Sequence, residues 1–379
     1  MTRTRLLKAL DAGPGAWLCR LLARRPDLAR NNADIAVPPP GEIRRLLVIR
    51  PGGIGDMLLL LPLLEALKRQ FPAAQTDIVC ETRNLDVLRL AEREEDALVY
   101  DAAPAGFLRR LRGRAYDVAI DSEQFHHFSA VFALLSGAPV RIGFKINPLR
   151  NPLYTHLVSY DPAGREALQF LRLLQPLGMD AAPGAFAARL NVAPASRPAP
   201  RAVLHVGSST RYKRWPPERF ADVAARLAAD GLHIVLIGDK RDRPAAAAVR
   251  SLSGLAPDRL TVLTGAASLA ETAATIAGAA VFVGPDSGLA HLAAVLGTPT
   301  VVLFGPSDPA KWGHTGPRDR IIHLDLPCAP CAIFGYHKPC RTIDCMQRIA
   351  IEEVLAAVRS QRGAGGPMHC PRLPPSPAP

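Results

Sequence analysis

Short continuous apolar runs alternate along this chain with longer segments in which apolar residues recur at helical spacing. In the first half, the run Leu46–Ile49 is typical of a buried parallel strand, and a helical pattern follows over Asp56–Gln70. Further strands are predicted at Thr76–Cys80, Ala97–Tyr100 and Asp117–Ile120. The Pro- and Ala-rich passage at residues 193–200 has no periodicity, and we interpret it as a linker.

The same alternation begins again after this passage. Strands are predicted at Ala202–Val206, His233–Ile237, Leu260–Thr264, Ala280–Val283 and Thr300–Phe304, and helices at Pro217–Ala229, Leu269–Ala277 and Gly288–Leu296. Strands that alternate with helices specify doubly wound parallel sheets. We therefore expect an α/β protein with two Rossmann-like domains, residues 41–192 and 201–362, and ligands in the cleft between the carboxyl ends of their strands.

The two ends of the chain have different patterns. In residues 1–40, leucines and Trp17 are interspersed with Arg and Lys, which predicts short basic amphipathic helices, broken near Gly13–Gly15, that lie on an anionic membrane surface. Residues 363–379 are rich in Gly and Pro and are predicted to be a disordered tail.

The formal net charge of +12 favours an anionic partner, which could be a nucleic acid, an anionic membrane or a phosphorylated substrate. Nucleic acid is the weaker choice, because aromatic residues make up only 6% and no recognition motif is present. The longest strongly apolar stretch, Met57–Leu64, is too short to span a bilayer, and no secretory signal is visible. We expect a soluble or peripheral protein in the cytoplasm.

The first motif that carries chemistry is Arg50–Asp56, which follows the first strand and opens a helix. Gly53 and Gly55 let the backbone approach a ligand closely. The turn has half of a dinucleotide-binding fingerprint, but Leu58 stands where Gly or Ala is normal, so a nicotinamide or flavin enzyme is a minor alternative. Asp56 suits either a helix cap or a general base.

Two further turns are suited to phosphate groups. Residues 207–215 offer hydroxyls, backbone N–H groups and three cations. Residues 284–291 place small residues between a strand and the positive end of a helix, where a diphosphate could be held. Each turn, taken alone, could also be a plain surface loop or a cap.

Four cysteines fall in a loop spanning residues 328–345. Cys328, Cys331, Cys340 and Cys345 could hold a structural zinc ion, but reduced thiols packed in a loop are the favoured interpretation.

Four segments resemble the lipopolysaccharide heptosyltransferase family (glycosyltransferase family 9): Leu47–Asp56, Lys213–Pro216, Gly284–His291 and Phe304–Pro309. The resemblance implies a GT-B architecture with an N-terminal acceptor domain and a C-terminal donor domain. It also implies inverting transfer of heptose from ADP-heptose to the inner core of lipopolysaccharide, near lipid A, with no required metal or cofactor.

Carried over to this sequence, the resemblance makes Asp56 the general base, with Gly53 and Gly55 in the acceptor-side loop. It assigns donor binding to Ser208, Ser209, Lys213, Asp242, Asp286, Ser287, Gly288 and His291. The alternative is a non-catalytic or differently acting nucleotide-binding protein on the same two-domain scaffold.

Overall fold

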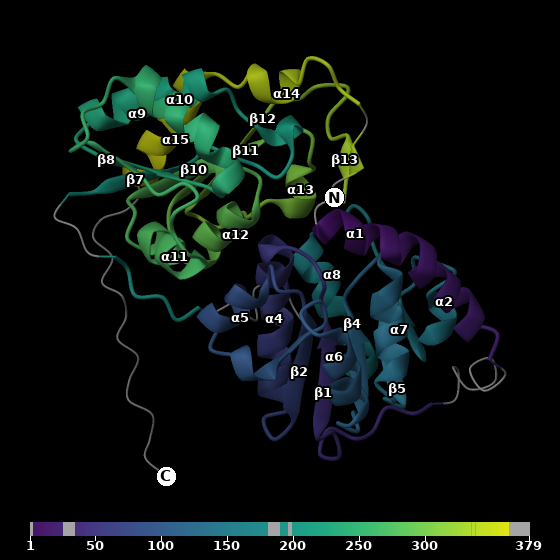
Figure 1. Ribbon diagram of the computed structural model, residues 1–379. Coiled ribbons are helices and arrows are strands. Elements are labelled where there is room, and N and C mark those ends of the chain that lie inside the picture. The colour runs from purple at the N-terminus through teal and green to yellow at the C-terminus, as the bar shows by residue number, and fades with distance from the viewer. Residues whose placement is uncertain are drawn as a thin grey trace, which may run out of the picture.

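The computed structural model describes residues 3–25, 35–180, 190–195, 199–334, 336–337 and 339–363. Parts of the N-terminal extension and of the predicted linker, and the predicted tail from residue 364 onward, lie outside the described residues. The chain forms two lobes, each built on one parallel sheet with helices on both faces (Figure 1).

The first sheet has the strand order β3-β2-β1-β4-β5-β6. Its strands are β1 Arg45–Ile49, β2 Gln75–Cys80, β3 Ala97–Val99, β4 Val118–Asp121, β5 Val140–Phe144 and β6 His156–Val158. Its helices are α4 Ile54–Gln70, α5 Leu85–Leu90, α6 Pro104–Arg112, α7 His127–Leu135 and α8 Glu166–Arg172, with 3₁₀ turns η2 Glu94–Asp96, η3 Asn151–Leu153 and η4 Gln175–Leu177.

The second sheet repeats this topology in the order β12-β11-β10-β7-β8-β9. Its strands are β7 Arg201–His205, β8 His233–Ile237, β9 Leu260–Val262, β10 Val281–Pro285, β11 Thr300–Phe304 and β12 Asp319–His323. Its helices are α9 Pro217–Ala229, α10 Arg243–Ser253, α11 Leu269–Ala277, α12 Gly288–Val295, α13 Pro309–Trp312, α14 Asp344–Gln347 and α15 Ile351–Gly363, with 3₁₀ turns η5 Arg211–Lys213 and η6 Lys240–Asp242. A small hairpin, β13 Ala332–Ile333 and β14 Tyr336–His337, follows β12.

The predicted fold class is confirmed, because both sheets are doubly wound and parallel throughout. Strand order reverses direction beside β1 in one sheet and beside β7 in the other, which is where open α/β sheets bind ligands. One apolar cluster continues across the lobes, because Leu58 of α4 and Leu292 of α12 belong to the same buried core. The switch points of the two sheets are thereby held face to face.

The N-terminal segment forms a continuous helix over α1 Arg3–Leu10, the π-helical turn η1 Asp11–Gly15 and α2 Ala16–Leu22. The expected break near Gly13–Gly15 is wrong: the wider π turn accommodates Pro14 inside the helix. This helix lies on the outer face of the first lobe, along α7 (Figure 1). Among the described residues, no helix combines the length and apolar character that crossing a bilayer requires.

Candidate active site

The glycine-rich turns of the two lobes meet at the start of α4 and α12. A Cβ atom built on Gly288 would lie 3.0 Å from the backbone nitrogen of Gly55, and one built on Gly55 would lie 2.9 Å from Cδ2 of His291. The approach at Gly288 is tighter than nearly all real Cβ contacts, and the approach at Gly55 is one that real Cβ atoms essentially never make, so this close contact depends on glycine at both positions. Residues that the sequence assigned to separate motifs, including Asp56 and His291, are therefore neighbours across the cleft.

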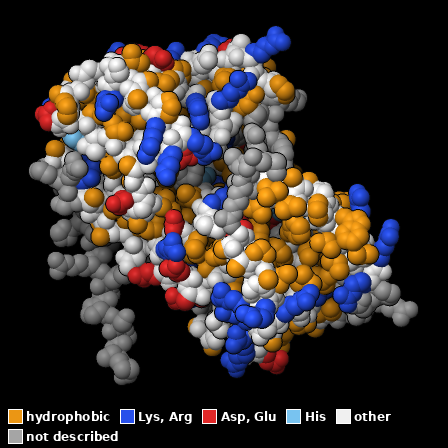
Figure 2. Space-filling view, viewed as in Figure 1, with side chains coloured by type: hydrophobic (Ala, Val, Ile, Leu, Met, Phe, Trp, Pro, Cys, Tyr) orange, Lys and Arg blue, Asp and Glu red, His pale blue; other side chains and the backbone are white. Residues whose placement is uncertain are grey.

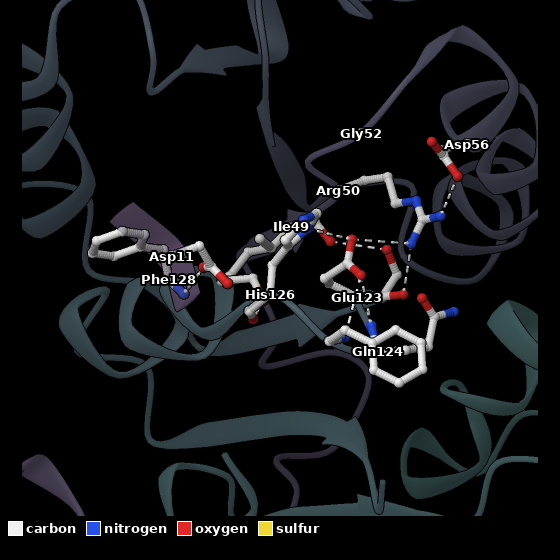
Figure 3. Close-up of polar contacts among 12 residues, drawn as sticks. Asp11, Ile49, Arg50, Gly52, Asp56, Glu123, Gln124, His126 and Phe128 are labelled. Carbon is white, nitrogen blue, oxygen red and sulfur yellow. Dashed lines mark hydrogen bonds and ion pairs between the residues drawn. The ribbon is translucent and has the colours of Figure 1, made fainter. Parts of the chain in front are cut away.

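Asp56 lies in the first turn of α4 and has two partners. Its Oδ2 accepts the Gly53 N–H at 2.6 Å. Its Oδ1 lies 2.8 Å from Nη2 of Arg50 (Figure 3). The side chain remains 36% exposed. Asp56 thus satisfies a backbone donor at the helix start, as a capping residue does, and still presents a carboxylate to the cleft.

A buried arginine that the sequence analysis did not single out anchors this carboxylate. Arg50 donates from Nη1 to the Ser122 carbonyl at 2.9 Å and lies 3.7 Å from the Glu123 carboxylate, which in turn lies 3.2 Å from Nδ1 of His126 (Figure 3). Burial by itself would lower the pKa of Arg50 and raise that of Glu123. The opposite charges outweigh burial, so the pKa of Arg50 is raised and that of Glu123 is lowered.

The sequence contains a pattern that could have indicated this network. The polar residues Ser122, Glu123 and Gln124 are buried and directly follow β4, which was predicted at Asp117–Ile120. Polar residues at the carboxyl end of a strand beside the switch point are candidates for a site.

On the donor side, Lys213 and Asp286 form an ion pair. Nζ of Lys213 lies 2.5 Å from Oδ2 of Asp286, which directly follows β10. Burial by itself would raise the pKa of Asp286, but the Lys213 ammonium and His291 hold it below its ordinary value. Because Asp286 is buried and Lys213 is partly exposed, the carboxylate fixes the cation at the edge of the cleft.

Ser287 is the N-cap of α12, so its hydroxyl is already engaged. Its Oγ accepts the Ala290 N–H at 3.4 Å and lies 3.1 Å from Nδ1 of His205. The first backbone N–H groups of α12, beginning at Gly288, carry the positive end of the helix dipole. Ser287 and Gly288 thus shape a helix start that suits an anion.

His291 is buried in the first turns of α12, and its Nδ1 lies 2.8 Å from Nε2 of His314. Burial lowers the pKa of His291 to about 4, and the neighbouring His314 and Lys213 lower it as well, while Asp286 and Asp56 oppose the shift. At neutral pH this imidazole is uncharged, and it packs against Gly55 of the first lobe while it contacts His314 of its own lobe.

The remaining predicted donor residues differ in exposure. Ser208 is buried, and its carbonyl oxygen accepts a hydrogen bond from Nη2 of Arg214 at 3.0 Å, whereas Ser209 is exposed. Asp242 is buried: it accepts the Asp239 N–H at 2.9 Å, and its carboxylate fills the space that a Cβ at position 207 would occupy. In this structure Asp242 makes the contacts of a residue that closes a turn, so its role in donor binding stays a prediction.

A second bridge between the lobes was also missed by the sequence analysis. Nζ of Lys311, in α13 just beyond the Phe304–Pro309 motif, lies 2.9 Å from Glu166 and 2.6 Å from the hydroxyl of Tyr160. Glu166 and Tyr160 belong to the first lobe, and Lys311 is buried between them. Because these partners lie far apart in the sequence, no local pattern predicts that they meet.

The cysteine loop packs against the second sheet. Cys345 is buried beside Gly305, and Cys328 is exposed. Burial raises the pKa of the Cys345 thiol to about 11, and Cys331, Cys340 and Cys328 add to the rise. No group of three or more His, Cys, Asp or Glu side chains in the described parts of the chain has the arrangement of a metal site, so the zinc alternative gains no support there.

Three comparisons place this geometry among known proteins. Residues 105–341 match glycosyltransferase family 9 (heptosyltransferase). Lipopolysaccharide heptosyltransferase 1 of Pseudomonas aeruginosa is 29% identical over 310 residues, which cover 76% of this chain and 86% of the relative. E. coli ADP-heptose lps heptosyltransferase II has a TM-score of 0.69 at 23% identity, over 84% of this chain and 99% of that one.

E. coli heptosyltransferase WaaC with ADP-2-deoxy-2-fluoro heptose has a TM-score of 0.65 at 20% identity, over 83% of this chain and 99% of that one. These structural similarities establish the two-domain GT-B fold that the motifs predicted. The family match covers more than half of the chain and includes the donor-side residues described above. The chain therefore belongs to glycosyltransferase family 9 (heptosyltransferase), and it is a glycosyltransferase.

Proposed function

We propose that the enzyme transfers heptose from ADP-heptose to the inner core of lipopolysaccharide, with inversion at the anomeric carbon. The observation that carries the proposal is that Asp56 of one lobe and the Lys213–Asp286 pair of the other all lie close enough to His291 to act on its charge, beside the Gly55–Gly288 contact. The named activities of the relatives above support the choice of sugar, nucleotide and acceptor.

In the proposal, the two domains bind different substrates. Residues 41–192 would bind the acceptor, with Gly53 and Gly55 allowing it to approach the backbone. Residues 201–362 would bind the donor, through Ser208, Ser209, Lys213, Asp242, Asp286, Ser287, Gly288 and His291, and residues 193–200 would link the two domains.

In the proposed reaction, an acceptor hydroxyl oxygen attacks the anomeric carbon while Asp56 takes the hydroxyl proton. The bond from the anomeric carbon to the diphosphate oxygen breaks, and ADP leaves with the electron pair. Lys213 and the N–H groups at the start of α12 stabilise the charge that develops on the diphosphate. Since these groups supply the positive charge, the proposed step requires no metal or other cofactor.

The proposed location is the cytoplasmic face of the inner membrane, as a peripheral protein. A lipopolysaccharide precursor carries lipid A, so its sugars project from a membrane surface, and an anionic surface is a suitable partner for a chain of net charge +12. No nucleic-acid partner is proposed.

Transfer to a purified inner-core acceptor that lacks heptose tests the proposal. The enzyme should release ADP from ADP-heptose only in the presence of acceptor, and the acceptor should gain the mass of one heptose residue. NMR of the new anomeric centre then tests inversion. Binding of ADP-heptose without transfer to such acceptors would favour the non-catalytic, nucleotide-binding alternative.

A further inference from the structure

The N-terminal helix has one face that is fixed to the first lobe. Asp11 is buried, and its two carboxylate oxygens accept the backbone N–H groups of His127 at 3.0 Å and Phe128 at 2.8 Å, which caps the start of α7. A Cβ at Gly15 would lie 3.2 Å from the Cβ of His127, so a residue without a side chain allows the helix to pack this closely. The orientation of the helix on the domain is thereby set.

The opposite face is apolar and exposed. Leu6, Leu10, Trp17 and Leu21 follow one another along it and are 47%, 41%, 59% and 47% exposed. They make up half of the large hydrophobic side chains that are strongly exposed in the described parts of the chain. We call these four residues the N-terminal apolar face. In Figure 2, hydrophobic side chains gather over α1 and α2 and continue onto the neighbouring α7, with Lys and Arg at the margins of this area.

The charges beside this face all have one sign. Lys8, Arg20 and Arg24 are exposed on the same helical segment. Asp11, the one acidic residue between positions 6 and 25, is buried against α7. A surface with leucines and a tryptophan at its centre and cations around it complements the interface of an anionic bilayer, where apolar side chains enter the acyl boundary and cations meet lipid phosphates.

We propose that the N-terminal apolar face docks on an anionic lipid bilayer. This deepens the proposed function, because it names the surface that would hold the enzyme beside a glycolipid acceptor. Lys8 and Asp11 of the helix line the same pocket as Pro51 and His126, which adjoin the Asp56 loop. Because this pocket lies on the domain-facing side of the helix, a docked helix holds it close to the lipid surface, at about one helix diameter.

Vesicle flotation of the full chain tests the proposal without relying on transfer. The wild type should bind phosphatidylglycerol vesicles, bind phosphatidylcholine vesicles less, and dissociate as salt rises. Trp17→Ser should weaken binding about tenfold or more, because a large side chain no longer enters the interface. Leu252→Ser is the matched control, since Leu252 is 57% exposed on α10 of the other lobe. It should bind like the wild type.

Two further measurements distinguish failure of the docking proposal from failure of the proposed function. Emission of Trp17 should shift to shorter wavelength on anionic vesicles, and this shift should be absent in Trp17→Ser. Wild type and Trp17→Ser should transfer heptose to a delipidated core oligosaccharide at equal rates. If neither protein transfers heptose to it, the result counts against the proposed function and not against the docking proposal. Equal vesicle binding by wild type and Trp17→Ser would overturn the docking proposal. So would a wild-type dimer that Trp17→Ser converts to a monomer, because the face would then join two copies.

Discussion

The Lys213 ammonium lies 2.5 Å from the Asp286 carboxylate, so the cation that we assign to the donor diphosphate is held in place by a buried anion. Such a pair orients the lysine before a ligand arrives, which reduces the entropy lost on binding. It also means that neither residue can be changed without affecting the other.

Lys213→Ala should weaken ADP binding, because it removes a cation beside two phosphates. A charged hydrogen bond contributes roughly 1.5–3 kcal/mol, which corresponds to about 10- to 150-fold in affinity. Asp286→Ala should also weaken binding, since Lys213 loses its anchor and the turn before α12 loses a buried carboxylate. Calorimetry with ADP measures both, with Arg250→Ala on the exposed face of α10 as control. Wild-type affinity in both variants would place the nucleotide elsewhere.

The stability of the fold should fall as the pH decreases from about 6.5 toward 4. Burial lowers the pKa of His205 and of His291 to about 4 in the folded chain, from an ordinary value of 6.5. Within this window the unfolded chain binds more protons, so protonation favours unfolding, by up to roughly 3 kcal/mol for each histidine. The stabilisation is complete above pH 6.5 and is lost toward pH 4.

Denaturant titrations across this pH range measure the slope. His291→Gln lacks one of the two groups and should lose stability less steeply as the pH falls. His323→Gln changes an exposed histidine and should keep the wild-type slope. If all three proteins share one slope, the buried histidines do not control the acid sensitivity.

Gly55→Ala should slow transfer while the protein remains folded. The added Cβ would lie 2.9 Å from Cδ2 of His291, so the two helix starts must move apart. Small misplacements of reacting groups cost up to about 100-fold in rate. Gly106→Ala in α6 is the matched control, because no atom lies within 4 Å of its added Cβ. Similar transfer rates in the two variants would show that close contact of the turns is not needed.

The sequence predicted the central strands and the two lobes well, because buried parallel strands are continuous apolar runs. It missed the interior strand β5, whose apolar run is interrupted by Arg141 and Gly143. It also missed the edge strands β6 and β12: β12 is largely polar, and β6 has only three residues. It placed Asp56, Lys213 and Asp286 within motifs, with Arg50 at the start of the first one, but it did not indicate that Asp56 pairs with Arg50 or that Lys213 pairs with Asp286. Motif spacing reports which residues share a turn, whereas ion pairs such as Lys311–Glu166 depend on how distant segments pack.

The cysteine loop should contain no tightly bound metal. Elemental analysis of the purified protein measures the content of zinc and iron, and a chelator should leave the melting temperature unchanged. One equivalent of metal, together with a lower melting temperature in Cys331→Ser, would instead support a structural metal site in the loop spanning residues 328–345.

Asp56→Asn should abolish most transfer and leave donor binding nearly intact. The carboxylate accepts the Gly53 N–H at 2.6 Å and contacts Arg50, so two explanations compete for this residue. Asp56 is the third residue of α4, and the side-chain oxygen of Asn could still accept the Gly53 N–H there, so a purely structural residue would tolerate the change. A general base would not, because the amide cannot take a proton, and base catalysis contributes about 10²- to 10⁴-fold.

Three measurements on the same Asp56→Asn protein separate these explanations. The melting temperature reports on the loss of the Arg50 contact, calorimetry with ADP reports on the donor site in the other lobe, and the transfer rate reports on proton acceptance. We expect a modest change in melting temperature, unchanged ADP affinity and a rate lower by two to four orders of magnitude. Near-normal transfer by the folded variant would leave Asp56 a helix-capping residue, and the base would have to be sought among the other carboxylates of the cleft.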